Sequence, residues 1–532
     1  MPTPLARAWT AGLLCAGITA SAAFYTYRLD SVPAYLTLDE AHFAVHAASI
    51  ADTGRNLNGQ LLPPLISLAD PEGEGFTLPW GTTYYLPFGM YLIAGALQVL
   101  PLSEAAVRTP SALLGGVVNI ALMYAVALAI FGSRRAAFAS AAVLAMSPAN
   151  LIISRQALDS VCQPPFILAA LWCLATYVRQ PDPRVGFAAG AILGAGIYAY
   201  ITSIVFMPFY LALFWFMAWR AGVLERRTVV YSIAGFAAAL APMALWLAVH
   251  PEAARSLLMQ YNRADPGSAT LMQTLTSGGI GAAVAETIHL YWSFFDPSFL
   301  FVQGGNARNL STGTTGVFLY PIAVLAPLGL YYLRDHRWAR LLIVIGLLAA
   351  PVPAVIKGTP YAIQRASGLL IFVSLLAGAG LAYSAISKRA AARAAAALLV
   401  VAMAWQFATF YRDYHGEYRV ASGFAYDPTA FRDAAESIIR IDADGGVGAV
   451  YIPSNFYDAS AKWRFYTQKH DRRALWLRTR YFDGVSGLET APPDTIAVLP
   501  AAIASSVAGW ETIAVIKDLG GEPAATLIRR AR

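Results

Sequence analysis

The stretch that decides the fold is VGFAAGAILGAGIYAYITSIVFMPFYLALFWFMAW, residues 185–219, which contains no charged side chain and lies between Arg184 and Arg220. Uninterrupted apolar blocks of 18 or more residues are typical of helices that span a membrane. This block is long enough for two spans, which we place at residues 185–201 and 203–219. The arginines at its two ends then lie on the same side of the membrane.

The rest of the chain has the same character. Of its 532 residues, 57% are hydrophobic and 13% are charged, against about 45–50% and about 25% in soluble domains. These proportions exclude a water-soluble enzyme. They predict a polytopic, all-α membrane region of about eleven transmembrane helices, placed at residues 9–27, 110–131, 136–152, 161–178, 185–201, 203–219, 229–249, 316–333, 338–356, 367–386 and 394–411.

Basic residues between the spans indicate the orientation. Fourteen lysines and arginines, against three acidic residues, occupy alternate short loops, which the positive-inside rule assigns to the cytoplasm. The N-terminus is therefore expected in the cytoplasm and the C-terminus on the outer side. The basic residues are Arg7, Arg134, Arg135, Arg179, Arg184, Arg220, Arg226, Arg227, Arg334, Arg337, Arg340, Lys388, Arg389 and Arg393.

The first span has an alternative interpretation. Ala20-Ser21-Ala22 could be a signal-peptidase site after a short basic start. The apolar run at residues 8–24 is long for a removable signal, which favours a retained helix.

Charge density predicts two domains. Residues 1–411 form the predicted transmembrane domain, with long outer loops at residues 28–108 and 250–315. The first loop has helical stretches with apolar faces, typical of helices that lie on the membrane surface. The second is rich in Gly, Ser, Thr and Asn around residues 304–316, which favours an ordered polar loop over a further span.

The C-terminal segment, residues 412–532, is predicted to be a separate outer-face domain. It contains 30 charged residues in 121, close to the proportion in soluble proteins, against 39 in the preceding 411. A helix start at Asp427-Pro428 and β-rich runs at residues 447–452, 495–499 and 512–516 predict a small α/β fold.

The composition also excludes two kinds of site. Cys15, Cys162 and Cys173 all fall in apolar segments, so no disulfide framework or metal cluster follows. The net charge of +7 comes from basic residues dispersed between the spans, which form no continuous stripe for a nucleic acid. The lipid bilayer is the partner that this distribution predicts.

The acidic pair Asp39-Glu40 follows the first span, at the predicted start of a helix that runs to about Asp52. Asp39 could be a simple N-cap, with Glu40 favouring the helix dipole. Alternatively, the pair supplies a carboxylate base at the membrane surface. Both interpretations stay open.

Four arginines form the second candidate group. Arg155 and Asp159 lie one helical turn apart between the third and fourth spans, which fits a plain ion pair. Arg108, Arg308 and Arg365 lie on the predicted outer side and could simply bind lipid headgroups. Several outward arginines in the same compartment as an acidic pair nevertheless indicate a phosphate-bearing ligand, because guanidinium groups bind phosphate oxygens bidentately.

These motifs resemble, in their order and their side of the membrane, those of the protein O-mannosyltransferase superfamily, which includes the lipid A aminoarabinose transferases. The resemblance covers roughly residues 1–411. The similar segments are Asp39-Glu40-Ala41-His42-Phe43, Arg108-Thr109-Pro110-Ser111-Ala112-Leu113, Ser147-Pro148 with Ser154-Arg155 and Asp159, Phe299-Leu300-Phe301 with Gly304-Gly305-Asn306 and Arg308, and Gln364-Arg365.

The resemblance implies a type-C (GT-C) membrane glycosyltransferase fold and a hexosyl- or pentosyltransferase. Such an enzyme moves a sugar from a polyprenyl-phosphate donor to a hydroxyl acceptor on the outer face, and we expect inversion at the sugar. The implied catalytic residues are Asp39 as the base, Glu40 beside it and Asp159 near the sugar. Arg108, Arg155, Arg308 and Arg365 would hold the donor phosphate, and His42 and Asn306 are weaker candidates for acceptor or sugar contacts.

The chain departs from the family pattern in ways that concern the acceptor. Gly304-Gly305-Asn306 stands where relatives often have an acidic residue after the glycine, and the large inserted sugar-binding domain of eukaryotic protein mannosyltransferases is missing. The acceptor could therefore be a glycolipid, a polysaccharide or a protein.

No metal is predicted, although a divalent ion is not excluded. His42, His46 and His289 are not grouped with enough carboxylates for a metal site. The lipid-linked sugar is a co-substrate, and no cofactor is expected.

A transporter or flippase of a phosphate-bearing lipid or sugar is the alternative class of function. It would show paired halves with broken spans or charges near the middle of the membrane. Here the charges cluster at the outer ends of the spans, and eleven spans divide poorly into two repeats. The Ala- and Arg-rich composition is compatible with a bacterial inner membrane, which would place the outer segments in the periplasm.

Overall fold

The structure is a computed structural model that describes residues 4–70, 84–261, 269–456, 459–501 and 507–531. It contains two compact units. Unit 1 comprises Met1–Tyr27, Tyr84–Gly89 and Ser111–Arg412, and unit 2 comprises Arg28–Thr83, Met90–Pro110 and Asp413–Arg532. Most of the first outer loop therefore groups with the C-terminal segment. The domain boundaries predicted from the sequence stay a prediction.

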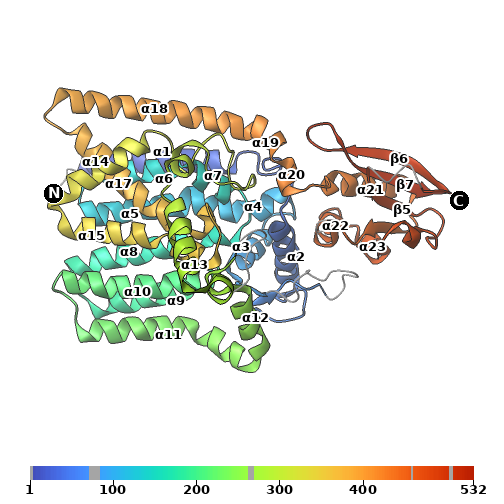
Figure 1. Cartoon of the computed structure of the whole chain (residues 1–532), viewed down its shortest axis with the longest axis horizontal. Coiled ribbons are helices and arrows are strands. Elements are labelled where there is room, and N and C mark those ends of the chain that lie inside the picture. The colour runs from blue at the N-terminus through green and yellow to red at the C-terminus, as the bar shows by residue number, and fades with distance from the viewer. Residues whose placement is uncertain (1–3, 71–83, 262–268, 457–458, 502–506, 532) are drawn as a thin grey trace. The chain divides into compact units, whose positions relative to one another are not determined.

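Unit 1 consists of long helices that run side by side (Figure 1). They are α1 (Pro4–Thr26), α5 (Asn119–Phe131), α6 (Arg134–Ala145), α7 (Pro148–Ser154), α8 (Pro164–Arg179), α9 (Pro183–Gly196), α10 (Ser203–Arg220), α11 (Arg226–Val249), α12 (Pro251–Tyr261), α13 (Leu271–Ser293), α14 (Ile322–Tyr332), α15 (Arg337–Ala349), α16 (Val352–Lys357), α17 (Gly368–Ala385) and α18 (Ala390–His415). Short helical turns lie between them at η1 (Leu114–Val118), η2 (Asp159–Cys162), η3 (Ser298–Val302), η4 (Leu333–Asp335) and η5 (Ile363–Arg365).

Seven helical stretches in the described part of the chain are long and apolar enough to cross a membrane. The pair α6 and α7, bent by 58°, would make an eighth. Every predicted span coincides with one of these stretches or with α1, α9 or α14. The predicted fold class, a polytopic helical membrane protein with a small α/β C-terminal domain, is confirmed, and the number of eleven spans stays a prediction.

The bend between α6 and α7 has a local cause. Pro148 is the first residue of α7 and has no N–H to continue the ladder of α6. Ser147 lies in an extended conformation, and its hydroxyl accepts the N–H of Asn150 at 3.4 Å. The sequence therefore starts a new helix at a point that hydropathy alone treats as one continuous span.

Glycines set the close approach of α9 to α11. Gly186, Gly190 and Gly194 recur every fourth residue and line one face of α9. A Cβ added to Gly190 would lie 1.9 Å from the carbonyl oxygen of Ser232 on α11. The two backbones can approach this closely only because side chains are missing there.

Residues 250–315 contain more helix than the polar composition predicts. α12 and α13 occupy residues 251–261 and 271–293, with a break in helical geometry at Gly279, whose φ is +76°. The polar loop proper begins after η3, at about Gln303. Gly and Ser are locally unfavourable in helices, and capping at Thr270 by the side chain of Gln273 outweighs them in α13.

Unit 2 combines helices of the first outer loop with the C-terminal α/β fold. The helices from the first outer loop are α2 (Leu38–Thr53), α3 (Phe88–Leu97) and α4 (Glu104–Leu113). The first residues of α3 and the last residues of α4 belong to unit 1. The helices from the C-terminal segment are α19 (Glu417–Ala421), α20 (Gly423–Tyr426), α21 (Phe431–Gly445), α22 (Ala459–Lys469) and α23 (Arg473–Leu477). Asp427 lies just before α21, where its carboxylate accepts the N–H of Phe431 at 2.9 Å.

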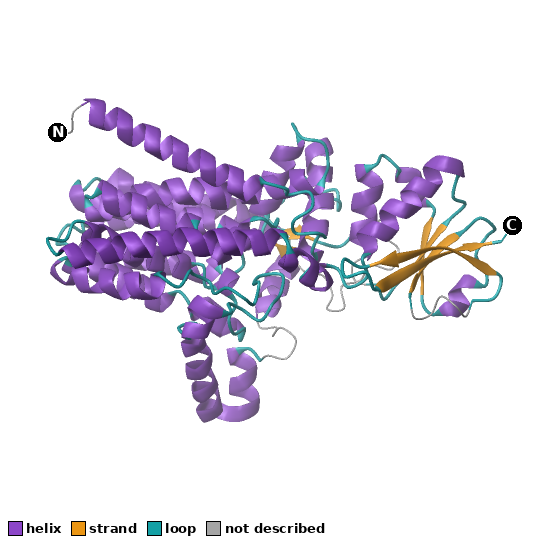
Figure 2. Ribbon diagram, turned by 90° about the horizontal axis from the view of Figure 1, so that it is seen from above, coloured by secondary structure: helices purple, strands orange, loops and turns teal. Residues whose placement is uncertain are grey.

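The C-terminal domain contains a five-stranded sheet in the order β4-β3-β5-β7-β6 (Figure 2). The strands are β3 (Val450–Pro453), β4 (Thr479–Phe482), β5 (Ile496–Pro500), β6 (Trp510–Lys517) and β7 (Pro523–Arg530). β3 pairs in parallel with β4 and β5, whereas β7 pairs antiparallel with β5 and β6. The three β-rich runs predicted from the sequence correspond to β3, β5 and β6.

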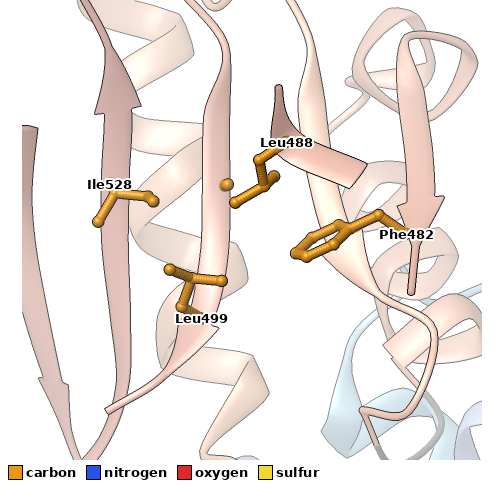
Figure 3. Close-up of a cluster of buried hydrophobic side chains, with 5 residues drawn as sticks. Phe482, Leu488, Leu499 and Ile528 are labelled. Carbon is orange, nitrogen blue, oxygen red and sulfur yellow. The ribbon is translucent and has the colours of Figure 1, made fainter. Parts of the chain in front are cut away.

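One face of this sheet carries a compact apolar cluster (Figure 3). Phe482, Leu488, Leu499 and Ile528 are all less than 9% exposed, and Ala497 lies among them. These side chains come from β4, η6 (Val485–Leu488), β5 and β7. Burial of apolar side chains from four segments holds the sheet together.

Candidate active site

The acidic pair lies at the N-terminus of α2, in unit 2. Thr37 is the N-cap, and its hydroxyl accepts the N–H of Glu40 at 3.3 Å. The carboxylate of Glu40 in turn accepts the N–H of Thr37 at 2.9 Å, which completes a capping box. Asp39 is therefore not the N-cap, and the capping function predicted as an alternative for it belongs to Thr37 and Glu40.

Glu40 also forms a fully buried ion pair with Arg108 of α4. Both side chains are 0% exposed, and Arg108 Nε donates to Glu40 Oε1 at 2.7 Å. The terminal nitrogens of Arg108 donate to Glu40 Oε2 at 3.2 Å and to the carbonyl oxygens of Leu29, Pro33 and Tyr35 at 2.7–3.0 Å. These bonds fix the loop before α2 against α4, so the guanidinium of Arg108 has a structural role.

Asp39 is half-buried in the first turn of α2. A carboxylate is a residue type that can serve as a general base. Because Glu40 is held by Arg108, Asp39 is the member of the pair that remains a candidate for proton transfer.

Two buried histidines lie further along the same helix. His42 is 2% exposed and His46 is 0% exposed. Burial lowers the pKa of His46 to about 3, and the electrostatic interactions with the neighbouring His42 and Arg464 act in the same direction against a backbone hydrogen bond with Leu68. His46 is therefore neutral at physiological pH. The described residues contain no group of three His, Cys, Asp or Glu side chains that could hold a metal ion.

Arg155 lies in unit 1, at the end of α7, and is 0% exposed. Its guanidinium donates to the carbonyl oxygens of Phe24, Tyr25 and Tyr27 at 3.3, 2.8 and 2.6 Å. These carbonyls belong to the last turn of α1 and the residues after it, where the helix has unsatisfied acceptors and a negative dipole end. Arg155 thus caps α1, and its predicted ion pair with Asp159 stays a prediction.

Asp159 begins η2 and is 8% exposed. Gln163, directly after η2, binds both neighbouring segments and was not identified from the sequence. Its amide nitrogen donates to the hydroxyls of Thr202 and Ser203 at 3.1 and 3.2 Å, and its amide oxygen accepts the hydroxyl of Ser367 at 2.9 Å. These bonds hold η2 against η5, which carries Arg365.

The polar loop after η3 lies against the same two segments. Gln156 Nε2 donates to the carbonyl oxygen of Asn309 at 2.7 Å. On the other side, a Cβ added to Gly305 would lie 3.0 Å from the carbonyl oxygen of Tyr361. Asn306 and Arg308 are exposed on this loop, and Arg308 donates to the carbonyl oxygen of Thr312.

Arg365 is half-buried at the end of η5 and donates to the hydroxyl of Thr359. A further cation precedes it, because Lys357 ends α16 and is half-buried. Lys357 was not predicted. Its only signal in the sequence is a lysine followed by Gly358, which ends the helix with a φ of +75°.

Unit 1 thus brings together three segments that are far apart in the chain, at residues 155–163, 303–316 and 357–367. They carry Asp159, Arg308 and Arg365, with Asn306 at the surface. Unit 2 holds Asp39, Glu40, Arg108 and His42. Taken by itself, unit 1 carries cations and one carboxylate on these segments, and unit 2 carries the half-buried carboxylate of Asp39.

Comparisons with known proteins agree with the sequence resemblance. Residues 85–246 match the family described as dolichyl-phosphate-mannose-protein mannosyltransferase. No curated protein matches the sequence.

The fold matches solved structures along almost the whole chain. The crystal structure of ArnT from Cupriavidus metallidurans bound to undecaprenyl phosphate is 14% identical, with a TM-score of 0.56 and coverage of 97% of this chain and 98% of that one. The oligosaccharyltransferase of Archaeoglobus fulgidus in its apo form is 13% identical, with a TM-score of 0.52 and coverage of 93% and 70%. The same archaeal enzyme, AglB, in complex with an inhibitory peptide and a dolichol-phosphate is 14% identical, with a TM-score of 0.50 and coverage of 88% and 64%. The chain is therefore a multi-pass membrane protein with the fold of the type-C glycosyltransferases, and its predicted resemblance to the superfamily that contains the protein O-mannosyltransferases is confirmed.

Proposed function

We propose that the protein transfers a sugar from a polyprenyl-phosphate donor to a hydroxyl group of an acceptor, with inversion at the anomeric carbon. The observation that carries this proposal is the fold match over 97% of the chain to ArnT bound to undecaprenyl phosphate. The cations on the joined segments of unit 1 support it, because a lipid-linked donor presents a phosphate.

In the proposed reaction, Asp39 accepts the proton of the acceptor hydroxyl as its oxygen attacks the anomeric carbon. A new carbon–oxygen bond forms there, and the bond between the anomeric carbon and the phosphate oxygen breaks. Polyprenyl phosphate leaves with the bonding electron pair. A hydroxyl is a poor nucleophile, so a positioned carboxylate lowers the barrier of this step.

Arg308 and Arg365 bind the phosphate and stabilise the charge that develops on it as it leaves. Lys357, half-buried and eight residues before Arg365, is a third candidate for this task. Asp159 accepts hydrogen bonds from sugar hydroxyls. His42 and Asn306 stay weaker candidates for sugar or acceptor contacts.

Arg108 and Arg155 have a different part in this proposal from the one predicted from the sequence. Arg108 positions the start of α2 through Glu40, and Arg155 positions α1, so both act on the site through the backbone. Neither is proposed as a phosphate ligand, because the guanidinium of Arg108 donates to carbonyl oxygens and to Glu40 and that of Arg155 donates to carbonyl oxygens.

The proposal includes a location. We assign the protein to a bacterial inner membrane with a cytoplasmic N-terminus and a periplasmic C-terminal domain. A lipid-linked donor suits such a site, because nucleotide-activated sugars are confined to the cytoplasm. A glycolipid, a polysaccharide and a protein all remain acceptor classes for the test.

The test is incubation of the purified protein with a panel of polyprenyl-phosphate sugars and membrane extract, with release of polyprenyl phosphate followed by mass spectrometry. Release should depend on the extract, and Asp39→Asn should lower kcat by about 10²–10⁴-fold. Asp30→Asn, an exposed carboxylate in the preceding loop, is the matched control and should keep wild-type turnover.

Two results would overturn the proposal. Turnover of no donor by the folded protein would reject sugar transfer, and movement of a phosphate-bearing lipid across proteoliposomes without acceptor would favour the flippase alternative. Wild-type turnover in Asp39→Asn would remove the assigned base.

A further inference from the structure

Unit 2 contains a polar cleft of about 590 Å³ that has no part in the chemistry proposed above. Small-molecule sites in proteins typically range from about 300 to 1,000 Å³, so this cleft has room for one or two sugar rings. One wall comes from the C-terminal half of α2 and the turn after α3, and the other from α22 and α23. The polar and aromatic lining includes Asp52, Arg464, Gln468, Asp471, Arg473 and Trp476.

The fixed part of the lining is an ion pair on an aromatic ring. Arg464 Nη1 donates to both carboxylate oxygens of Asp70 at 2.5 and 2.6 Å, and the guanidinium lies 5.3 Å from the ring centroid of Trp476. Arg464 and Asp70 are each less than 10% exposed. The charge of Arg464 is therefore compensated, and its contacts hold this wall rigid.

The remaining polar groups offer both donors and acceptors. Gln468 has a buried amide oxygen with no hydrogen-bond partner among the described residues, which leaves an acceptor for a ligand donor. Asp52 and Asp471 add two carboxylates and Arg473 adds a guanidinium. Asp471 is exposed at the turn between α22 and α23, where its backbone has a φ of +53°.

This mixture fits a neutral ligand with many hydroxyls. Each hydroxyl group is one donor and two acceptors, and planar carboxylate, amide and guanidinium groups match adjacent hydroxyls in pairs. An anionic ligand would meet the carboxylates of Asp52 and Asp471 in the same cleft, whose described lining contains two cations, Arg473 and the Arg464 that Asp70 already neutralises. The chemistry therefore favours a saccharide over a phosphate.

We propose that this cleft binds an uncharged saccharide unit of the acceptor. The proposal rests on the function proposed above, because it assigns the acceptor class of the same reaction. It makes the acceptor a glycolipid, a polysaccharide or a glycosylated protein that already carries a neutral sugar, and it gives the C-terminal domain a part in substrate recognition.

The experiment is saturation-transfer difference NMR on the full chain in lipid nanodiscs. The probes are the methyl glycosides of glucose, mannose, galactose, N-acetylglucosamine and arabinose, with inorganic phosphate as the anionic competitor. At least one glycoside should receive saturation, and phosphate should not displace it. Gln468→Ala and Arg473→Ala should each weaken the bound glycoside about fivefold, because each removes one hydrogen bond.

Two further variants test the charge of the cleft and provide a control. Asp471→Asn preserves the shape and the positive φ but removes a charge, and it should also weaken glycoside binding. Arg480→Ala removes an exposed arginine of β4 that does not line the cleft, so it should bind like the wild type. Near-UV circular dichroism identifies any variant that has lost its fold.

Each contrary outcome overturns the inference. Saturation of no glycoside, equal binding in Gln468→Ala and Arg473→Ala, or displacement by phosphate would reject a neutral saccharide site. These outcomes are independent of donor turnover. Release of polyprenyl phosphate without glycoside binding would support the proposed sugar transfer and reject the saccharide site. Glycoside binding without release of polyprenyl phosphate would support the saccharide site and reject the proposed sugar transfer.

Discussion

The four arginines predicted to bind phosphate fall into two groups that look alike in the sequence. Arg108 and Arg155 are 0% exposed, and their guanidinium groups donate to backbone carbonyls that end or precede helices. Arg308 is exposed and Arg365 is half-buried, and both lie on short segments joined by side-chain bonds. The contrast teaches that arginines which look alike in the sequence can differ completely in burial: a fully buried guanidinium ties segments of the fold together, whereas an accessible one can still meet a ligand.

The largest expected effect comes from breaking the structural group. Arg108→Ala leaves the carboxylate of Glu40 buried without its cation, and removal of one partner of a buried pair costs about 3–5 kcal/mol of stability. Denaturant unfolding in detergent would measure this loss. Arg480→Ala, exposed on β4, is the control and should change stability by less than about 0.5 kcal/mol. Equal stability of the two variants would mean that Arg108 does not have the structural role assigned to it.

Substitutions of the two accessible arginines, Arg308 and Arg365, should lower turnover and leave stability unchanged. Arg365→Ala should lower kcat about 100-fold, the typical cost of one donor to a developing anion, and leave the unfolding midpoint unchanged. Arg365→Lys should recover part of the rate, because a point charge still attracts the phosphate. Arg337→Ala, an exposed arginine at the start of α15, should keep wild-type turnover. A large drop in stability without a change in kcat would reverse the assignment of Arg365.

A conservative change sharpens the structural group further. Arg155→Lys keeps the charge at the end of α1 but loses the planar fork that reaches Phe24, Tyr25 and Tyr27. We expect a loss of about 2 kcal/mol, because bonds from a charged donor contribute about 1.5–3 kcal/mol each and the lysine retains some of them. Thermal unfolding measures the loss. Wild-type stability of Arg155→Lys would mean that the positive charge at the end of α1, and not the planar shape of the guanidinium, provides the stabilisation.

The smallest effect is expected for ionic groups that are only half-buried. Glu436 accepts hydrogen bonds from Lys469 at 2.9 Å and from His470 at 2.8 Å. Burial alone would raise the pKa of Glu436, but the bonds from His470 and Lys469 outweigh it and lower the pKa. The pairing therefore stabilises the fold above the ordinary carboxyl pKa and is lost as the pH falls through the lower pKa of the folded state.

Glu436→Gln should consequently cost at most about 1 kcal/mol at neutral pH, since partly exposed ion pairs contribute little. The difference from the wild type should disappear in acid, below the pKa of Glu436 in the folded protein. Unfolding curves from neutral to acidic pH would follow this convergence. A difference that persists unchanged in acid would assign the stabilisation to packing.

Local patterns predicted most of the fold. Every apolar block of about 20 residues coincides with a helix, because the cost of leaving backbone groups unpaired in lipid forces such a block to be helical. The β-rich runs of the C-terminal domain were also recognised, but β4 and β7 were not, since Arg480 and the terminal arginines interrupt their apolar pattern.

The site was predictable only in part. The helix that starts at Asp39 followed from capping signals within a few residues. The partners of Arg108, Arg155 and Gln163 lie 68, 130 and 204 residues away along the chain, and hydropathy carries no information about such distant pairs. For this reason the sequence grouped all four arginines together, although Arg108 and Arg155 are fully buried in the structure and Arg308 and Arg365 are not.

The contact between Arg155 and the end of α1 also bears on how the chain is assembled during synthesis. An arginine entering a bilayer without a partner costs about 2.5–3.5 kcal/mol on insertion scales. The carbonyl acceptors of Arg155 lie about 130 residues earlier in the chain, so α1 is synthesised before α7 emerges from the ribosome. We therefore expect that truncation of α1, which removes these acceptors, slows the membrane insertion of α7 as well as destabilising the finished protein.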